Sequence, residues 1–348
     1  MSQPHVASHE AVCHRERVSD PTIRTALARV PWKRAAWAAV AAIVAFALIV
    51  VVATWLRTLP TVEAFVDEYP GEAPLPEWAP VGIPGWLAWQ HFFNAFLLVM
   101  LVRTGLILRA KQRPAAFWTR DNTRWPRTRR APRRLGVSLW LHLWVEAFWV
   151  VNGVIYVVLL FATGQWVRIV PTDWSIVPHA LSVALQYASL DWPIENAWVV
   201  YNALQVLSYF VVVFIAAPLA ILTGLRLSPV WPAEGGVARV LSERSARALH
   251  FPTMLFLLAF TFVHVVLVFS TGVLRNLNAM YAARDADDWV GFAIFAVSVA
   301  VMAVGWVLAR PLLLLPVAEK TGQVRRMPPA PPAPPTRSVD GRAERAQG

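Results

Sequence analysis

Six apolar stretches run through the chain, and each is long enough to form a helix that crosses a bilayer. They occupy about 34–56, 85–108, 136–162, 198–225, 247–272 and 288–315. A transmembrane helix needs about 20 apolar residues, because each residue advances the helix by about 1.5 Å. Hydrophobic residues make up 57% of the chain and charged residues only 15%. The sequence therefore predicts an all-α polytopic membrane protein with six transmembrane helices.

Basic residues in the loops predict the orientation of these spans. Segment 109–135 is densely basic and segment 226–249 carries four arginines, whereas segments 58–84 and 273–287, on the other side, are acidic or mixed. Short loops rich in Lys and Arg stay in the cytoplasm. We therefore predict that both termini are cytoplasmic.

The same pattern divides the chain into a core and additions. The predicted parts are an N-terminal tail (1–32) without the order of a cleavable signal, an additional transmembrane helix (33–57), a four-helix core (85–273), a sixth helix (288–315) and a Pro-rich tail (316–348). The composition of the second tail is typical of disorder.

Composition also excludes several classes of function. Cys13 is the single cysteine, which rules out an intramolecular disulfide, a cysteine-ligated iron–sulfur cluster and a Cys-based zinc site. The net charge of +11 could suggest nucleic acid, but the basic residues cluster beside apolar spans, so membrane orientation and lipid contact explain them better. Neither a phosphate-binding loop with its lysine nor a dinucleotide fingerprint is present.

Four histidines lie in spans two to five, and they pair by depth. His250 and His264 are separated by roughly 21 Å along one helix and leave nearly the same face, since fourteen residues make almost four turns. The predicted directions of the spans put His142 level with His250 near the inner side, and His91 level with His264 near the outer side. Each pair could hold one b-type haem through two axial imidazoles.

Other roles for these histidines remain open. A lone histidine in a membrane often forms hydrogen bonds between helices. A proton-conducting chain is the main rival, although it would favour one continuous path with several carboxylates. His179 lies in a predicted surface helix outside the spans and is a weak candidate ligand.

Three segments of the chain resemble the bacterial di-haem cytochrome b subunits. They are HFFNAFLLVMLVRTG (91–105), NALQVLSYFVVVFIAAPLAILTGLRLSP (202–229) and ALHFPTMLFLLAFTFVHVVLVFSTG (248–272). That family includes formate dehydrogenase gamma subunits, nickel–iron hydrogenase cytochromes and thiosulfate reductase cytochrome b subunits. The resemblance covers about 85–280, and the additional N-terminal span departs from it.

The resemblance implies a four-helix haem-binding bundle in a bacterial cytoplasmic membrane, in which His91, His142, His250 and His264 are the axial ligands of two b-type haems. It also implies that electrons pass between quinone and an extrinsic redox subunit, a molybdenum or other metal enzyme, that carries out the substrate chemistry. Two alternatives are kept. One is a self-sufficient haem membrane reductase of a small acceptor, and the other is a non-haem proton-coupled transporter.

Further polar residues in the spans are candidate quinone or proton sites. Glu146 is one turn after His142 and could relay protons, orient that histidine or pair with an arginine. Asn202 and Gln205, with Tyr201 and Tyr209, form a predicted polar stripe that could bind a quinone head group. Hydrogen bonding between helices is the alternative for this stripe, and also for Asn94 and Asn152.

Two weaker patterns complete the prediction. Arg103 and Arg275 could each contact a haem propionate or reach the lipid phosphates. Four Thr-Gly pairs stand near the C-terminal ends of spans two to five, where glycine suits the left-handed position that ends a helix: Thr104-Gly105, Thr163-Gly164, Thr223-Gly224 and Thr271-Gly272.

Overall fold

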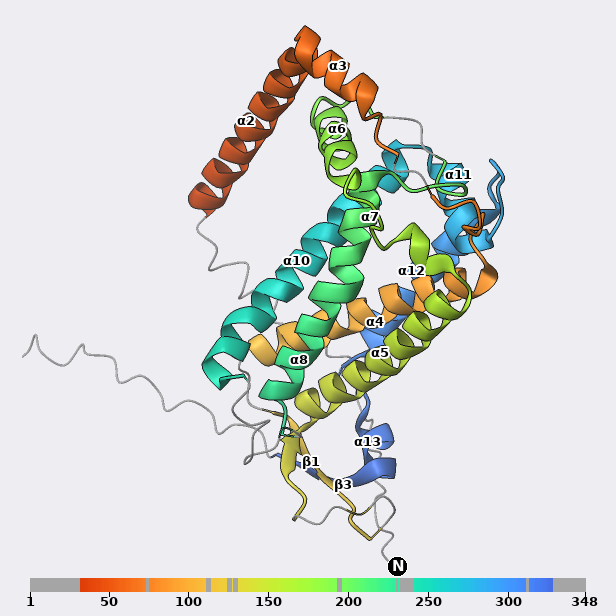
Figure 1. Ribbon diagram of the computed structural model, residues 1–348. Helices are drawn as coiled ribbons and strands as arrows, with labels where there is room; N and C mark the ends of the chain where they lie inside the picture. Colours follow the sequence, from red (N-terminus) through yellow and green to blue (C-terminus); the bar gives the residue numbers. More distant parts are fainter. Residues whose placement is uncertain are drawn as a thin grey trace, which may run out of the picture.

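The computed structural model describes residues 32–72, 75–110, 114–123, 127, 131–192, 196–229, 231, 241–310 and 313–327 (Figure 1). The predictions for Cys13, for the N-terminal tail up to residue 31 and for the tail beyond residue 327 lie outside these residues. Within them, six helices are long and apolar enough to cross a membrane, which confirms the predicted number of spans and the all-α class.

The bounds of these helices lie within a few residues of the predicted apolar stretches, with larger differences at the start of the fourth span and the end of the sixth. They are α2 (Trp32–Arg57), α4 (Gly85–Arg109), α5 (Val137–Ala162), the composite span Ala203–Leu227, α10 (Glu243–Ser270) and α12 (Val290–Leu308). Many large apolar side chains of these helices are exposed and few are buried, as expected where hydrocarbon rather than protein surrounds them. The chain is therefore a multi-pass membrane protein.

Two helix pairs form the centre of the molecule (Figure 1). Packing is extensive between α4 and α5, and between α10 and α8 (Ala217–Leu227), but sparse from one pair to the other. The sixth span, α12, packs on α4 and on the π-helical turn η3 (Asn278–Ala282). Gly291 of α12 lies against the backbone of Leu277 and Asn278, where a side chain would overlap it. Only glycine therefore allows this approach.

The fourth span is built from three segments: α7 (Ala203–Phe210), a π-helical turn η2 (Val211–Ala216) and α8. Pro218, at the second position of α8, has no N–H to donate to the carbonyl one turn earlier. The π-helical turn comes directly before it, where the regular hydrogen-bond pattern would be interrupted. The proline thus gives a physical reason for the position of this irregular turn.

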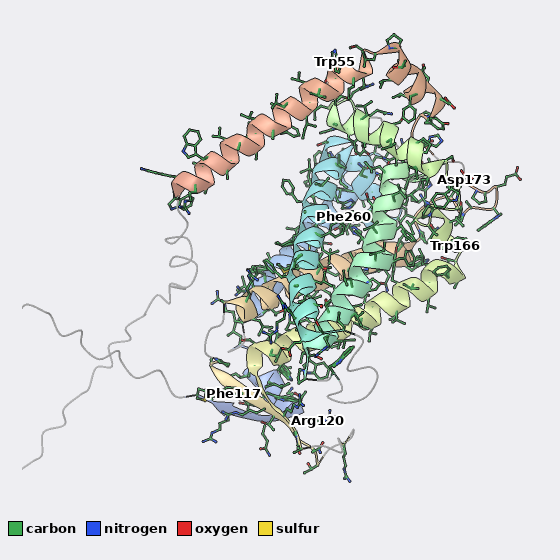
Figure 2. The ribbon with its side chains drawn as sticks, turned by 60° about the vertical axis from the view of Figure 1, so that its left-hand side comes forward. Trp55, Phe117, Arg120, Trp166, Asp173 and Phe260 are labelled. Carbon is green, nitrogen blue, oxygen red and sulfur yellow. The ribbon has the colours of Figure 1, made fainter. Side chains whose placement is uncertain are left out.

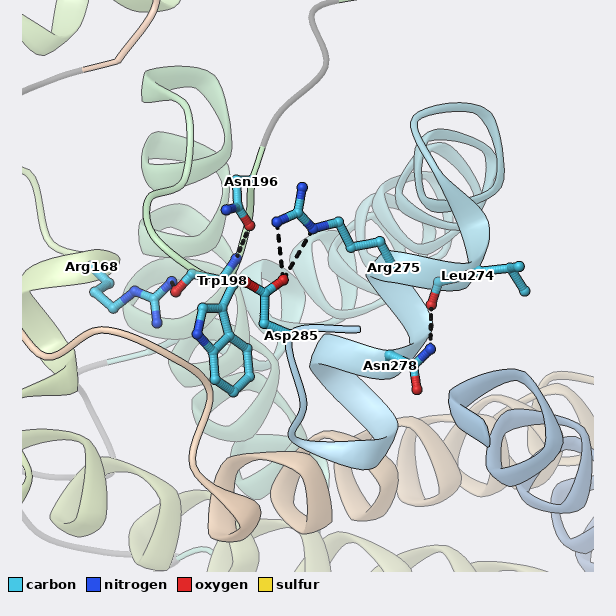
Figure 3. Close-up of polar contacts among 7 residues, drawn as sticks. All are labelled: Arg168, Asn196, Trp198, Leu274, Arg275, Asn278 and Asp285. Carbon is cyan, nitrogen blue, oxygen red and sulfur yellow. Dashed lines mark hydrogen bonds and ion pairs between the residues drawn. The ribbon is translucent and has the colours of Figure 1, made fainter. Parts of the chain in front are cut away.

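Buried polar residues hold the connections at one end of the bundle, which we call the outer end after the predicted orientation. Arg168, in the short helix η1 (Gln165–Arg168), is 1% exposed and donates to the carbonyls of Gly82 and Ala197 at 2.6 Å each. Figure 3 shows it beside Trp198, near the ion pair between Arg275 and Asp285. One cation therefore joins three segments that are distant in sequence.

The first span, α2, lies apart from the helix pairs in Figure 1. It packs on α3 (Pro60–Glu68) and on α6 (Ile176–Ala188) at the outer end. Arg57, its last residue, donates to the hydroxyl of Ser189 at 2.8 Å and pairs with Asp191 at 2.6 Å. The first span therefore contacts the described rest of the chain mainly at the outer end.

A small antiparallel sheet stands at the opposite, inner end. The central strand β1 (Ala116–Arg120) pairs with β2 (Arg134–Gly136) on one side and with β3 (Gly322–Arg326) on the other. The helix α13 (Leu315–Thr321) precedes β3. Residues 316–326 therefore differ from the prediction of a disordered tail, because Leu315, Ala318 and Val324 pack in a core with Trp118 and Trp140.

Candidate functional site

The outer histidine pair joins the two helix pairs. The imidazole of His91 on α4 faces that of His264 on α10, with 6.2 Å between ring centroids and 57° between ring planes. Two metal–nitrogen bonds of about 2 Å, plus about 1 Å from each nitrogen to its ring centre, would separate two axial imidazoles by roughly 6 Å. The spacing of this pair therefore fits a single metal ion held between the rings.

The inner pair is held by threonines of the neighbouring helices. The hydroxyl of Thr104 on α4 lies 2.8 Å from Nδ1 of His142 on α5. The hydroxyl of Thr223 on α8 lies 3.0 Å from Nδ1 of His250 on α10. Each helix pair thus presents one histidine in the same way.

These contacts favour a proton on Nδ1 of each ring. The Thr104 hydroxyl is placed to donate to the carbonyl of Met100 at 2.8 Å, and the Thr223 hydroxyl to that of Leu219 at 2.6 Å. A hydroxyl has one hydrogen to donate, so a threonine that donates to its carbonyl accepts from the histidine Nδ1–H. Nε2 then carries a free lone pair. This is the tautomer that a histidine needs in order to bind a metal through Nε2.

Of the two glycines that follow these threonines, Gly224 gives its histidine room. A methyl group on Gly224 would lie 3.3 Å from Cε1 of His250, which is tight, whereas one on Gly105 would make an ordinary contact at 3.6 Å with Cε1 of His142. Both glycines are inside helices, so the predicted helix-ending role is wrong for them. It is confirmed for Gly164 and Gly272, which follow helix ends and have φ of +73° and +120°.

Glu146 belongs to the inner pair. It is buried on α5, one turn after His142, and its Oε1 has no hydrogen-bond partner. A methyl group on Gly224 would lie 2.6 Å from this oxygen, so the carboxyl group reaches across to α8 beside His250. The structure therefore places Glu146 at the inner pair. Among the described residues, no arginine pairs with it, although the sequence had left that partner open.

Aromatic rings surround the outer pair in place of threonines. Phe260 stacks on His264, with centroids 5.7 Å apart and planes 8° apart. Tyr209 meets the same ring edge-on at 6.2 Å, and Tyr281 meets His91 edge-on at 5.5 Å. Nδ1 of His91 has no hydrogen-bond partner. The two pairs therefore differ in their surroundings, one polar and one aromatic.

The predicted polar stripe of the fourth span is only partly helical. Asn202 is the N-cap of α7 and accepts from the backbone of Gln205 at 2.8 Å, while the Gln205 side chain accepts from the Asn202 backbone at 3.1 Å. The Asn202 amide also donates to the Tyr187 hydroxyl at 2.7 Å. These contacts form a capping box, so both side chains start the helix. Tyr201 lies before the helix and packs under Arg168.

The other candidates lie away from the histidine pairs or have other contacts. His179 is buried on α6 and accepts from the Gly71 amide at 3.2 Å, which fixes a loop. The Arg103 guanidinium lies over the Trp306 ring at 5.1 Å. Arg275 pairs with Asp285 at 3.0 Å. Asn152 is buried with an unpartnered amide nitrogen.

Sequence reasoning missed the contacts of Thr104 and Thr223 with the histidines, although both residues were noted as parts of Thr-Gly pairs. The depth of these pairs in the membrane could have revealed the contacts, because the Thr-Gly pairs of spans two and four are predicted to lie level with His142 and His250. Tyr281 and Phe260 gave no signal that separates them from ordinary packing residues.

A scan against protein-family models finds no match for this chain, and searches of curated proteins and of solved structures find none either. The resemblance to di-haem cytochromes b therefore stays a hypothesis, and the function has to be argued from the histidine pairs themselves.

Proposed function

We propose that this chain is a di-haem membrane cytochrome b that transfers electrons between the quinone pool and a partner oxidoreductase subunit. The observation that carries the proposal is the inner pair. Two histidines from different helix pairs each contact a threonine hydroxyl through Nδ1, which leaves Nε2 as the nitrogen available to a metal. A histidine that only joined two helices would not need this arrangement twice at the same depth.

The fit to haem rests on three features of this chain. The ring spacing of the outer pair matches two axial ligands of one iron. The four histidines come as two pairs, and the described residues hold no group of three or more metal-ligating side chains. Packing between the helix pairs is sparse, which suits a flat group that lies between them. When bound, the two haems would supply one-electron carriers near each face of the membrane.

The remaining residues of the site bind and orient the haems or hold protons. Thr104 and Thr223 fix the orientation of the inner imidazoles, and Gly224 keeps the space beside His250 and Glu146 clear. Glu146 is the one carboxyl group described beside the inner pair, and its free oxygen can take up a proton there. We assign it to proton exchange with a quinone bound near the inner end.

A reduced-minus-oxidised visible spectrum of the purified full chain tests the proposal. We expect b-type absorbance from two haems. His91→Ala should remove the outer haem alone and His142→Ala the inner one alone, while the control His179→Gln, which changes a buried histidine on α6, should keep both. The absence of b-type absorbance in the wild type would overturn the proposal. It would leave the proton-coupled transporter as the remaining candidate.

A further inference from the structure

One face of the sheet at the inner end exposes two arginines on either side of an aromatic ring. In the strand register, Phe117 of β1 lies opposite Arg325 of β3, and Thr119 lies opposite both Arg134 of β2 and Gln323 of β3. Residues opposite each other in a sheet point to the same side. Arg134, Arg325 and Gln323 are exposed. We call Arg134, Phe117 and Arg325 the basic sheet face.

The opposite side of the sheet is covered, so the basic sheet face cannot turn inward. Ala116, Trp118 and Val324 alternate with the exposed residues and pack in the core that α13 and the start of α5 share. Figure 2 shows the sheet at the inner end of the bundle and labels Phe117 on it. The sheet is thus fixed to the helices by one face and presents the other to its surroundings.

The charges of this face are not neutralised within the described part of the chain. No described Asp or Glu forms an ion pair with Arg134 or Arg325. The Arg134 guanidinium lies over the Phe117 ring at 4.0 Å, which holds it in one position without consuming its charge. Arginine and aromatic residues are the types most enriched at the centres of protein interfaces. Arg134 also donates to Sδ of Met327 at 3.6 Å, which is uncharged. The face therefore has the composition of an interface and has no carboxylate partner among the described residues.

We propose that the basic sheet face is the docking site of a separate soluble protein that presents carboxylates around an apolar or aromatic side chain. Neither end segment of the sequence has the acidic character of this occupant. Residues 1–31 contain four arginines against three acidic residues, and residues 328–348 contain three against two. The acidic segment 58–84, which includes α3, is at the opposite end of the bundle in Figure 1, so a second copy in the same membrane would bring arginines against arginines.

An acidic protein fits this face better than anionic lipid does. Lipid phosphates are met by flexible Lys and Arg side chains that extend from helix ends. Here the guanidinium of Arg134 is stacked on a ring in a sheet that the core holds in place, which gives a rigid pattern of charge and apolar surface. Rigid patterns favour a partner of complementary shape. The inference uses none of the histidines and so is independent of the proposed haem function.

Fluorescence anisotropy of an acidic peptide tests the proposal, with the full chain in phosphatidylcholine nanodiscs. The probe is a fluorescein-labelled peptide of glutamates around a central tryptophan, and its match has glutamine in place of every glutamate. We expect the glutamate peptide alone to bind. The double variant Arg134→Gln/Arg325→Gln should weaken this binding at least about tenfold, and Phe117→Ala should weaken it several-fold.

The matched control is Arg244→Gln/Arg247→Gln, which removes the same charge from exposed positions on α10 at the same end. It should leave binding within about twofold. Size-exclusion elution and circular dichroism establish that each variant is folded. Equal losses in both double variants, or no binding by the wild type, would overturn the proposal. The proposal would also be overturned if the peptide bound neither protein while phosphatidylglycerol, added to the nanodiscs, bound the wild type but not the sheet variant.

Discussion

At the scale of single residues, the two Thr-Gly pairs at the inner end differ from the two at the outer end. Thr104 and Thr223 contact histidines, whereas the Thr163 hydroxyl is exposed and bonds the Leu159 carbonyl, and the Thr271 hydroxyl accepts from Asn276. One dipeptide therefore serves two purposes, and depth in the membrane separates them.

Removing a threonine hydroxyl should weaken haem binding at the inner pair alone. In Thr104→Val, Nδ1 of His142 loses its acceptor, and the loss of such a partner typically costs about 10–100-fold in metal affinity. We expect about one haem per chain after purification, measured by the pyridine haemochrome assay. Thr104→Ser should retain two. Thr163→Val is the control and should also retain two, and loss of the outer haem in Thr104→Val would contradict the assignment.

The Glu146 carboxyl group should matter for quinone chemistry and not for haem content. Glu146→Gln keeps the shape and burial of the side chain but removes the group that can exchange a proton. We expect quinol-dependent haem reduction to slow by about 10²-fold or more, followed by stopped-flow absorbance, with an unchanged static spectrum. The comparison variant is Asn152→Asp, which adds a carboxyl group to the same helix further from His142 instead of removing one. Unaltered reduction kinetics in Glu146→Gln would remove the carboxyl group from the proposal.

At the scale of elements, the close packing of α12 on η3 depends on one glycine and one asparagine. The Asn278 amide donates to the carbonyls of Leu274 at 3.1 Å and Asp288 at 2.6 Å, and its oxygen accepts from the Gly291 amide at 3.0 Å. Asn278 is fully buried. A single side chain therefore satisfies three backbone groups where the sixth span joins the core.

Gly291→Ala should destabilise the protein, because the new methyl group would overlap the backbone of Leu277 and Asn278. Overpacking of this kind costs about 1–3 kcal/mol, which should lower Tm by several degrees in a detergent thermal-shift experiment. Gly153→Ala is the matched control, since its methyl group meets no atom within 4 Å. It should leave Tm unchanged or raise it, because alanine is the better helix former. Equal effects in both variants would show that α12 does not pack closely on η3.

The spans could be predicted from the sequence because bilayer thickness imposes a length and a composition that few other structures share. The pairing of His91 with His264 followed from span direction, since antiparallel helices bring opposite ends together. The sheet could not be predicted in this way. β1 and β3 are five residues each, 201 residues lie between Arg120 and Gly322, and the basic residues of both strands follow the same rule that marks any cytoplasmic loop. The capping role of Asn202 was missed because Asn202 and Gln205 were interpreted as a polar stripe, although their three-residue spacing before an apolar run is typical of a helix start.

At the scale of the whole molecule, the two ends of the bundle have opposite character. The outer end holds the acidic segment 58–84 and the buried Arg168, and the inner end holds the sheet and its exposed arginines. The rule on basic loops assigns the inner end to the cytoplasm. This assignment also decides on which side the acidic partner would have to be.

Cysteine labelling of intact spheroplasts tests the assignment. In a Cys13→Ser background, Asp287→Cys places a thiol on the exposed outer loop and Gln323→Cys places one on the exposed side of β3. A membrane-impermeant maleimide should modify the first at once and the second only after permeabilisation. Both thiols should react equally in detergent, which controls for reactivity. The reverse pattern would invert the topology and place the basic sheet face outside.

The composition of the sheet has a consequence for the order of synthesis. β1 and β2 come from the connection between the second and third spans, but β3 is made only after the sixth span. Arg325 therefore joins Phe117 and Arg134 only after all six spans have been made. A nascent chain that has inserted five spans displays only part of the basic sheet face, so a partner that requires both arginines would recognise chains with all six spans and pass over those with fewer.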